Sequence, residues 1–185
     1  MIRVFILATI LLTSLLSKDS FNIGVLYWSM NIDGQVAMRD GLEAELDKIN
    51  KKAIDSGAPT INYTYYVAGD GGAGIEKQIG QFYELIDKKP DIIIVQPTDN
   101  AALAKPLLEA NKKKIPVIAY DQYISGGKLL SFITTDNYQA GYLNGEFIST
   151  YFDKKRVLEV ILVEYPHVSS TVDRVEGFLG ALKDL

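Results

Sequence analysis

The sequence lacks the short motifs that usually mark a catalytic centre. No serine stands in a G-x-S-x-G elbow, and neither H-E-x-x-H, C-x-x-C nor the phosphate-binding G-x-x-x-x-G-K-[ST] occurs. The chain has no cysteine and a single histidine, His167, which excludes a thiol nucleophile and a multi-histidine metal site. A general base would have to be assembled from His167 and a distant carboxylate. We therefore expect neither an enzyme nor a bound cofactor or metal.

Polar side chains instead follow two apolar runs that read as strands. Gln96 comes directly after residues 91–95, and Asp121 and Gln122 come directly after residues 117–120. In an open parallel sheet, ligands bind beyond the carboxyl ends of the strands, so these side chains should share one rim. Their amide and carboxylate groups can satisfy hydroxyl groups, which both donate and accept hydrogen bonds.

Aromatic rings and an arginine complete this candidate set. Tyr27 and Trp28, the only tryptophan, end an earlier apolar run, and Arg174 lies near the start of the last predicted helix. Rings can cover the apolar face of a sugar, and an arginine fork can donate to its oxygens. The residues at the predicted rim therefore favour a site for a neutral, polyhydroxylated ligand.

Each of these residues also has a simpler interpretation. Asp99 can cap a helix and Asp121 can cap a turn. Arg174 can form a surface salt bridge, and His167 can be a solvated loop histidine. Trp28 can belong to the core. The residues alone leave these alternatives open.

The elements that must position the rim are clearest in residues 91–121, which read as strand, helix and strand. The first run is continuously apolar and rich in isoleucine, as expected for a parallel strand covered on both faces. A helix should begin at Thr98 or Asp99, whose side-chain oxygens can cap it, and Pro106 should kink it mildly. Residues 117–120 form the second strand, so the segment predicts a βαβ unit.

Similar patterns along the chain predict an α/β fold with a doubly wound parallel sheet. One strand is tyrosine-rich and alternates, which suggests a position near the sheet edge. The other predicted strands are 21–28, a segment that ends near Thr134, and 156–164; the edge strand is 61–67, and the predicted helices are 35–53, 75–88, 138–152 and 171–185.

Three glycines between a predicted strand and helix offer a second kind of site. Gly69, Gly71 and Gly74 match the dinucleotide fingerprint G-x-G-x-x-G. The next strand, however, ends in Gln96, where an acid would have to meet a ribose hydroxyl. A structural loop between strand and helix is the favoured interpretation, and a flavodoxin-like or dinucleotide-dependent enzyme is an alternative.

Residues 1–17 predict the destination of the chain. They carry one positive charge at Arg3, then a mostly apolar run over residues 4–16, and no acid, as in a secretory signal peptide. A helix over that run would span about 20 Å, short of a bilayer core of about 30 Å. Leu15 fits a cleavage site poorly, which leaves an uncleaved anchor open. The net charge of −4 argues against a nucleic-acid partner, and we expect a periplasmic protein.

Four segments together resemble the type I periplasmic sugar-binding proteins of ABC importers, in the ribose, galactose and xylose group. They are DIIIVQPTDNAAL, KKIPVIAYDQ, ITTDNYQAGYLNGEFI and DRVEGF. The resemblance implies residues 21–134 as an N-terminal α/β lobe and residues 135–185 as the start of an incomplete C-terminal lobe. The hinge would fall at Thr135 and Asp136. Members of that group are longer, so this chain is expected to be a fragment or an interrupted reading frame.

The resemblance also implies roles for single residues. Asp121 matches the group's sugar-binding aspartate, Gln96 stands where an amide reaches the ligand, and Arg174 matches an arginine of the second lobe. His167 lies near the position of a ligand-contacting histidine in galactose-type members. Gln122 replaces an arginine that is frequent in pentose-binding members.

The first loop departs from the pattern of that group. It reads WSMNIDGQ, without the usual paired aromatic residues. Tyr27 or Trp28 would substitute for them, and Asn31 in the same loop is a further ligand-binding candidate.

The function that the resemblance implies is capture of a monosaccharide or related polyol by closure of two lobes, without covalent change. The sugar would pass to an ABC permease in the membrane, and the protein would act as a monomer. An alternative on the same fold is a sensor that hands a bound sugar or a signalling furanone to a chemoreceptor or membrane kinase.

Overall fold

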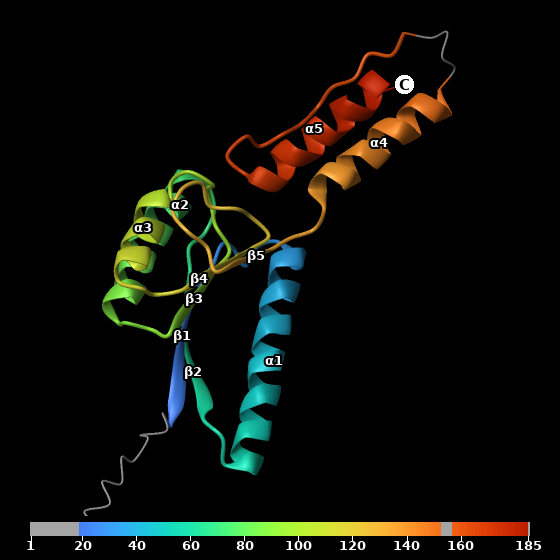
Figure 1. Ribbon diagram of the computed structural model, residues 1–185. Coiled ribbons are helices and arrows are strands. Elements are labelled where there is room, and N and C mark those ends of the chain that lie inside the picture. Colours follow the sequence, from blue (N-terminus) through green and yellow to red (C-terminus); the bar gives the residue numbers. More distant parts are fainter. Residues whose placement is uncertain (1–18, 153–156, 185) are drawn as a thin grey trace, which may run out of the picture.

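A computed structural model describes residues 19–152 and 157–184, which contain a five-stranded parallel sheet with helices on both faces (Figure 1). The strand order is β2-β1-β3-β4-β5. The predicted α/β class with a doubly wound parallel sheet is confirmed. In chain order the elements are β1 (Ser20–Tyr27), α1 (Asp33–Ser56), β2 (Thr60–Val67), α2 (Gly71–Asp87), β3 (Ile92–Val95), α3 (Ala104–Lys112), β4 (Val117–Tyr120), β5 (Ser131–Ile133), α4 (Asn137–Tyr151) and α5 (Ser169–Asp184).

The main core lies between the sheet and the two helices α2 and α3. Successive side chains of a strand point to opposite faces, so Ile93 and Val95 of β3 and Val117 and Ala119 of β4 all face this side. These four side chains are fully buried. Their partners on the helices and loops are Phe82, Leu85, Ile86, Leu103, Leu107, Ala110, Ile115 and Ile124.

The opposite face of the sheet is covered less completely. Helix α1 lies along this face and contacts β2. Ile92 and Ile94 of β3 are consequently only partly buried, although the sequence predicted a strand covered on both faces. The tyrosine-rich strand β2 lies at the sheet edge, as predicted.

Helix α3 begins later than predicted, at Ala104 rather than at Thr98 or Asp99. Pro106 explains the shift, because it has no N–H and cannot continue a helical ladder that begins further upstream. It is tolerated in the first turn of the shorter helix, so no kink is needed. Asp99 instead caps a turn: its Oδ1 accepts hydrogen bonds from the backbone N–H groups of Ala101 and Ala102 at 2.8 and 2.7 Å.

The strand predicted over residues 156–164 is wrong for the residues that the structure describes there. Residues 157–164 run as an irregular segment beside the helices α4 and α5. Val157, Ile161 and Val163 are more than 90% exposed. The apolar pattern is that of a strand, but among the described residues no other strand lies beside this segment to complete its hydrogen bonds.

Helices α4 and α5 form a closely packed pair that extends away from the sheet (Figure 1). Glycines allow this approach: a Cβ added at Gly141 would lie 1.9 Å from the carbonyl oxygen of Arg174. A Cβ at Gly177 would lie 2.0 Å from the carbonyl oxygen of Tyr138. The two backbones are therefore in direct contact, which only glycine permits at these positions.

The predicted signal peptide at residues 1–17 lies outside the described residues. Within the ranges that are described, none of the helices combines the length and apolarity needed to cross a membrane. Export of the chain therefore stays a prediction.

Candidate functional site

Gln96 and Asp121 form the centre of the rim. Gln96 follows β3, is fully buried, and its Nε2 donates a hydrogen bond of 2.9 Å to Oδ2 of Asp121 at the end of the neighbouring strand β4. The Oε1 atom of Gln96 accepts from the backbone N–H of Trp28 at 3.4 Å. Adjacent parallel strands end at one edge, so the side chains of Gln96 and Asp121, which follow β3 and β4, meet there as predicted, and the backbone that follows β1 joins them through the Trp28 N–H.

The backbone of Asp121 is held on both sides. Its N–H donates to the carbonyl of Ile133 at 2.9 Å, and its own carbonyl accepts from the hydroxyl of Thr134 at 3.0 Å. Its φ angle of 64° lies in the left-handed region, which a non-glycine residue adopts at a cost. No hydrogen bond from the described part of the chain reaches Oδ1 of Asp121, so this oxygen is available to a ligand hydroxyl.

The two aromatic candidates of the first strand lie in different environments. Tyr27 is fully buried, and its ring packs 6.0 Å from the ring of Tyr65, with Arg39 also above it. Burial raises the pKa of the Tyr27 phenol, to which the charge of Glu43 adds. Tyr27 is therefore a core residue rather than a surface on which a sugar could stack. Trp28 is only partly buried and stays available on the rim.

Asn31 lies in a polar cluster at the start of α1. Its side-chain Nδ2 donates to Oδ2 of Asp70 at 3.0 Å, and the hydroxyl of buried Ser29 donates to the same oxygen at 3.1 Å. The backbone N–H of Asn31 also donates to Ser29 Oγ at 3.1 Å. These bonds tie the loop after β1 to the loop after β2, which leaves Asn31 exposed at the rim but fixed in place.

The side chain of Gln122 forms hydrogen bonds with the start of α5 and does not point into open space. Its Nε2 donates to the hydroxyl of Ser170 at 2.8 Å, and its Oε1 accepts from the Ser170 N–H at 3.2 Å and from the Ser169 hydroxyl at 3.3 Å. Gln122 and Ser170 are both buried. The amide of Gln122 thus joins the sheet to the helical pair and is already satisfied.

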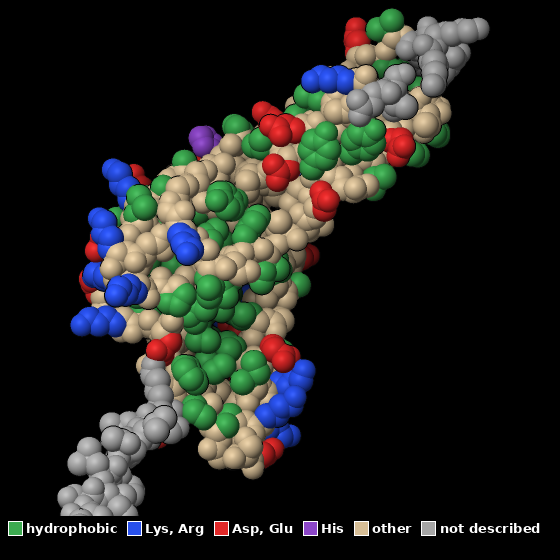
Figure 2. Space-filling view, viewed as in Figure 1, with side chains coloured by type: hydrophobic (Ala, Val, Ile, Leu, Met, Phe, Trp, Pro, Cys, Tyr) green, Lys and Arg blue, Asp and Glu red, His purple; other side chains and the backbone are tan. Residues whose placement is uncertain are grey.

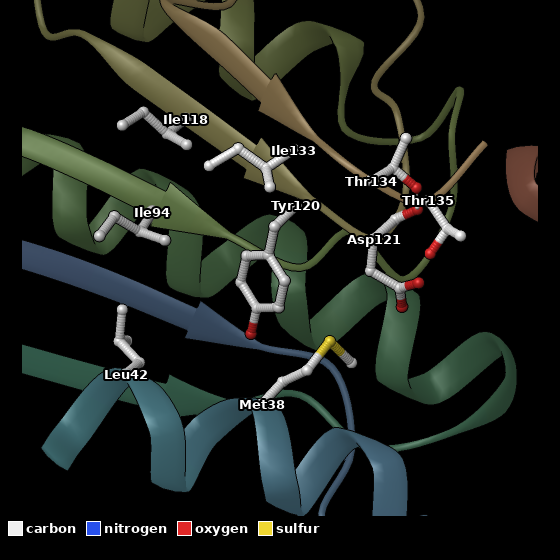
Figure 3. A pocket seen from close by; sticks show the side chains of 9 residues that line it. All are labelled: Met38, Leu42, Ile94, Ile118, Tyr120, Asp121, Ile133, Thr134 and Thr135. Carbon is white, nitrogen blue, oxygen red and sulfur yellow. Dashed lines mark hydrogen bonds between the residues drawn. The ribbon is translucent and has the colours of Figure 1, made fainter. Parts of the chain in front are cut away.

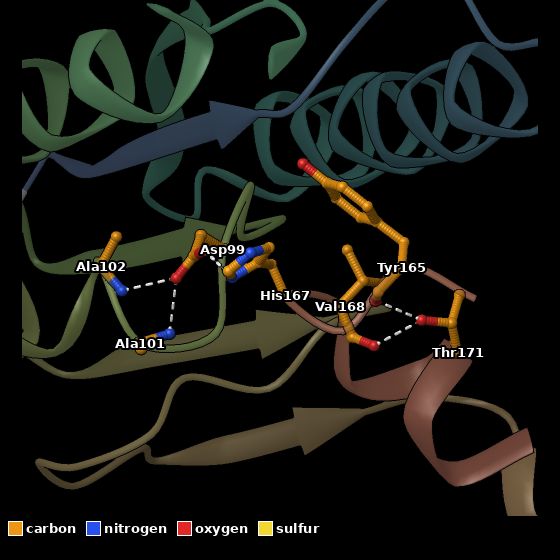
Figure 4. Close-up of polar contacts among 7 residues, drawn as sticks. All are labelled: Asp99, Ala101, Ala102, Tyr165, His167, Val168 and Thr171. Atoms are coloured by element: carbon orange, nitrogen blue, oxygen red, sulfur yellow. Dashed lines mark hydrogen bonds and ion pairs between the residues drawn. The ribbon is translucent and has the colours of Figure 1, made fainter. Parts of the chain in front are cut away.

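His167 belongs to the same junction (Figure 4). Its Nδ1 lies 3.4 Å from Oδ2 of Asp99, and its carbonyl accepts from the N–H of Asn100 at 3.1 Å. Its ring meets Tyr165 edge to face and is largely exposed. Arg174 lies one to two turns along α5 and is exposed, and within residues 19–152 and 157–184 no polar contact joins its side chain to Asp121 or Gln96.

The segment between β5 and α4 contains the two residues predicted as a hinge. Asp136 caps α4, because its Oδ1 accepts from the N–H of Gln139 at 2.9 Å. The side chain of Asn137 donates to the carbonyl of Thr135 at 3.0 Å and to the hydroxyl of Thr134 at 3.2 Å. The chain passes here from the sheet to the helical pair (Figure 1), and the hinge stays a prediction.

A groove of about 500 Å³ opens on the less covered face of the sheet, with Asp121 at one end (Figure 3). Met38 and Leu42 of α1 form one wall, and Ile94 and Ile118 of the sheet form the floor. The hydroxyl of Tyr120 is buried here without a partner among the described residues, and burial raises the pKa of this phenol. The polar groups of the groove gather at its Asp121 end, where Thr134 and Thr135 also lie.

The glycine loop has a structural explanation. Gly69 and Gly71 have positive φ angles of 109° and 65°, and a Cβ at Gly74 would lie 2.1 Å from the carbonyl oxygen of Gly69. The tight turn itself thus requires glycine. The carboxylate of Asp70 lies beside the start of α2, where a pyrophosphate would have to bind, and would repel it. These contacts support the structural loop over the dinucleotide site.

Surface charge differs between the two parts of the molecule. Lysine and arginine side chains gather over α2 and α3, whereas acidic side chains line the helical pair (Figure 2). The rim between them carries carboxylates and amides at Asp70, Asp99, Gln96 and Asp121. Such a surface suits a neutral hydroxylated ligand better than a polyanion.

Gln78 lies directly under the rim, although no role for it is predicted from the sequence. It donates to the carbonyl of Gln96 at 2.8 Å and accepts from the N–H and hydroxyl of Thr98, both at 2.8 Å. A signal was present: Gln78 shares the buried stripe of its helix with Phe82 and Leu85, four and seven residues later. A polar residue on such a stripe needs a partner in the core.

The chain is an α/β protein with a doubly wound parallel sheet, and Gln96 and Asp121 meet at the carboxyl ends of its strands. A profile of the periplasmic binding protein domain matches residues 23–184, and the chain belongs to this family.

Sequence relatives carry sugar-binding names. The ribose import binding protein RbsB of Bacillus subtilis is 27% identical over 163 residues, which cover 88% of this chain and 48% of the relative. A D-xylose-binding periplasmic protein of Haemophilus influenzae is 32% identical over 71 residues, or 38% of this chain and 21% of that protein. The chain spans about half the length of the RbsB relatives it matches.

Solved structures share the same architecture. The fructose-binding periplasmic domain of the hybrid two component system BT1754 superposes with a TM-score of 0.70 at 25% identity, covering 89% of this chain and 50% of that one. A Caulobacter myo-inositol-binding protein gives a TM-score of 0.71 at 23% identity, covering 89% and 51%. At 23% identity, the similarity to the myo-inositol-binding protein shows a shared fold and nothing further.

Proposed function

We propose that this chain is the sugar-capturing part of a periplasmic solute-binding protein that serves an ABC importer. The observation that carries the proposal is the Asp121 carboxylate: Gln96 holds one of its oxygens, and no hydrogen bond from the described residues reaches the other. A charged acceptor of this kind forms strong hydrogen bonds with a sugar hydroxyl. Membership of the periplasmic binding protein family and the names of the relatives support the same reading.

The ligand in this proposal is a monosaccharide or related polyol, bound between residues 21–134 and residues 135–185 and released unchanged. Trp28 supplies a stacking surface, Asn31 a second amide, and Arg174 reaches the ligand only after the helical pair moves toward the rim. No catalytic step is part of the proposal. The hydrogen bonds of Gln122 with Ser170 keep the two parts together in the arrangement described.

A sensor is the second candidate, since the BT1754 domain named above is the fructose-binding part of a hybrid two component system. Both roles use the same capture step. They differ in the membrane protein that reads the closed state. Genes for a permease and an ATPase beside this one would favour import, whereas a gene for a kinase would favour sensing.

A ligand screen tests the proposed capture step. Thermal unfolding and Trp28 fluorescence would be followed with D-ribose, D-xylose, D-fructose, D-glucose, myo-inositol and NAD. We expect saturable stabilisation by one sugar or polyol, which Asp121→Asn weakens and which the distant exposed variant Asp87→Asn leaves unchanged. A response to NAD alone would refute the proposal and revive the glycine loop, whereas a response to none of the compounds would refute the proposal without favouring the glycine loop.

A further inference from the structure

Gln78 is a fully buried amide whose hydrogen-bonding capacity is met at the base of the rim. Its Nε2 donates to the carbonyls of Gln96 and Tyr27 at 2.8 and 3.4 Å. Its Oε1 accepts from the N–H and the hydroxyl of Thr98, both at 2.8 Å. One side chain of α2 thus joins the end of β1, the end of β3 and the loop that follows β3.

The contact with the Gln96 carbonyl affects the rim because both ends of the Gln96 side-chain amide are already hydrogen-bonded. Its side chain spans from the Trp28 N–H to the Asp121 carboxylate, so its position depends on where its backbone is held. A buried, fully satisfied polar network is rigid, since any displacement leaves a donor or acceptor unpaired. The Gln96 backbone is held at its N–H by the Leu26 carbonyl and at its carbonyl by Gln78, each at 2.8 Å, and its side chain in turn holds Oδ2 of Asp121.

Gln81, one turn further along α2, shows that burial alone does not create this role. It is buried to a similar degree, but its Nε2 makes a single hydrogen bond, to the carbonyl of Val67 at 3.0 Å. Its Oε1 has no partner among the described residues. Gln81 supports the edge strand β2, and among the described residues no hydrogen bond joins it to Gln96.

We propose that Gln78 is a positioning residue for ligand binding, which orients the Asp121 carboxylate through Gln96 without touching the ligand. Only the expected effect on the affinity for a sugar rests on the proposed function. The orientation itself is a property of the free protein and can be measured without any sugar.

The test compares Gln78→Met, which keeps the shape and removes the hydrogen bonds, with Gln81→Met as the matched control. The first readout is the side-chain amide of Gln96 in the free protein, followed by NMR chemical shift and hydrogen exchange. We expect exchange to become about tenfold faster and the shift to move in Gln78→Met, and neither to change in Gln81→Met. The second readout is the affinity for the sugar that stabilises the protein most in the screen.

Affinity should fall about tenfold in Gln78→Met, and adding it to Asp121→Asn should cause little further loss, because both changes act on the same hydrogen bond, the one between the Asp121 carboxylate and the ligand. If Gln78→Met does not fold, Thr98→Val removes one hydrogen bond of the network and should shift the Gln96 amide to a smaller extent. An unchanged Gln96 amide, or an equal change in Gln81→Met, would overturn the inference even if a sugar binds. A perturbed Gln96 amide in a protein that binds no sugar would uphold the positioning and refute the proposed function instead.

Discussion

At the scale of single residues, the rim depends on one carboxylate, that of Asp121, whose two oxygens differ in their hydrogen bonding. Oδ2 of Asp121 is committed to Gln96, and Oδ1 faces the rim. The positive φ angle of Asp121 carries a backbone cost that the flanking hydrogen bonds to Ile133 and Thr134 offset. Such a residue is suited to binding, because its orientation is settled before the ligand arrives.

Asp121→Asn should weaken sugar binding by about tenfold to a hundredfold, because a hydrogen bond to a charged acceptor contributes roughly 1.5 to 3 kcal/mol. Titration calorimetry would give the change in affinity. Asp87→Asn is the control, since Asp87 is exposed and pairs only with Lys113 across helices. Equal affinities of the Asp121 variant and the unaltered protein would show that the carboxylate does not meet the ligand.

The buried phenols of Tyr27 and Tyr120 predict a loss of stability in alkali. Burial raises both pKa values above the ordinary 10.0, so the folded state retains protons that the unfolded chain releases. The contribution of the two protonated phenols to the free energy of unfolding is complete below pH 10 and is lost as the pH rises above 10. The part of the tyrosinate absorbance that is missing when both tyrosines are replaced by phenylalanine should therefore appear together with the loss of circular dichroism. Gradual appearance of that part in a folded chain would contradict the prediction. The double variant Tyr27→Phe/Tyr120→Phe should delay the transition.

At the scale of elements, the sequence predicted the parallel strands and the residues at their ends, but it did not predict the contacts of those residues. Gln96 and Asp121 share a rim because polar residues directly follow apolar strands, and that pattern is local. The partner of Gln122, by contrast, is a serine 48 residues away. Tyr27 was assigned to the ligand because it precedes Trp28, although alternation along a strand turns neighbours to opposite sides.

The strand predicted over residues 156–164 illustrates the same limit. Its apolar, β-branched residues satisfy the local preference for a strand, yet a strand also needs a neighbour. Pro106 shows a second limit: the sequence predicted a kink within a longer helix, whereas the missing N–H of Pro106 instead sets where α3 starts. Neither the exact start of this helix nor long-range pairing followed from the local pattern.

The contact between α4 and α5 should be intolerant of even one methyl group. Gly141→Ala or Gly177→Ala would place Cβ within about 2 Å of a backbone oxygen, which forces the helices apart. We expect a loss of about 1 to 3 kcal/mol in the free energy of unfolding by urea. Gly80→Ala in α2, where nothing lies within 4 Å, should instead stabilise by up to about 1 kcal/mol. Equal effects at the three sites would contradict this account of the helix pair.

At the scale of the whole molecule, two parts meet through a small polar junction. Gln122, Ser169 and Ser170 supply most of its hydrogen bonds, and His167 and Asn100 add one between backbones. The parts are linked in the chain by residues 134–136, which connect β5 with α4. Relative motion of the two parts would thus require the breaking of few contacts, as ligand-driven closure needs.

Gln122→Leu should loosen this junction, because it leaves the buried Ser170 without its partner. The radius of gyration from small-angle X-ray scattering should rise, while the circular dichroism of the sheet and helices stays the same. Gln139→Leu, at an exposed position of α4, is the control. A radius of gyration that is unaffected by Gln122→Leu would mean that other contacts hold the two parts together.

We propose that a sugar binds at the rim formed by Gln96 and Asp121. The most direct measurement is an NMR chemical-shift map of the isotope-labelled protein, titrated with the sugar or polyol that stabilises it most. We expect saturable shifts of the Gln96 side-chain amide, the Trp28 indole and the Asp121 backbone, with little change at α3. Shifts confined to the groove beside Ile94 and Ile118, or no shift with any sugar, would contradict it.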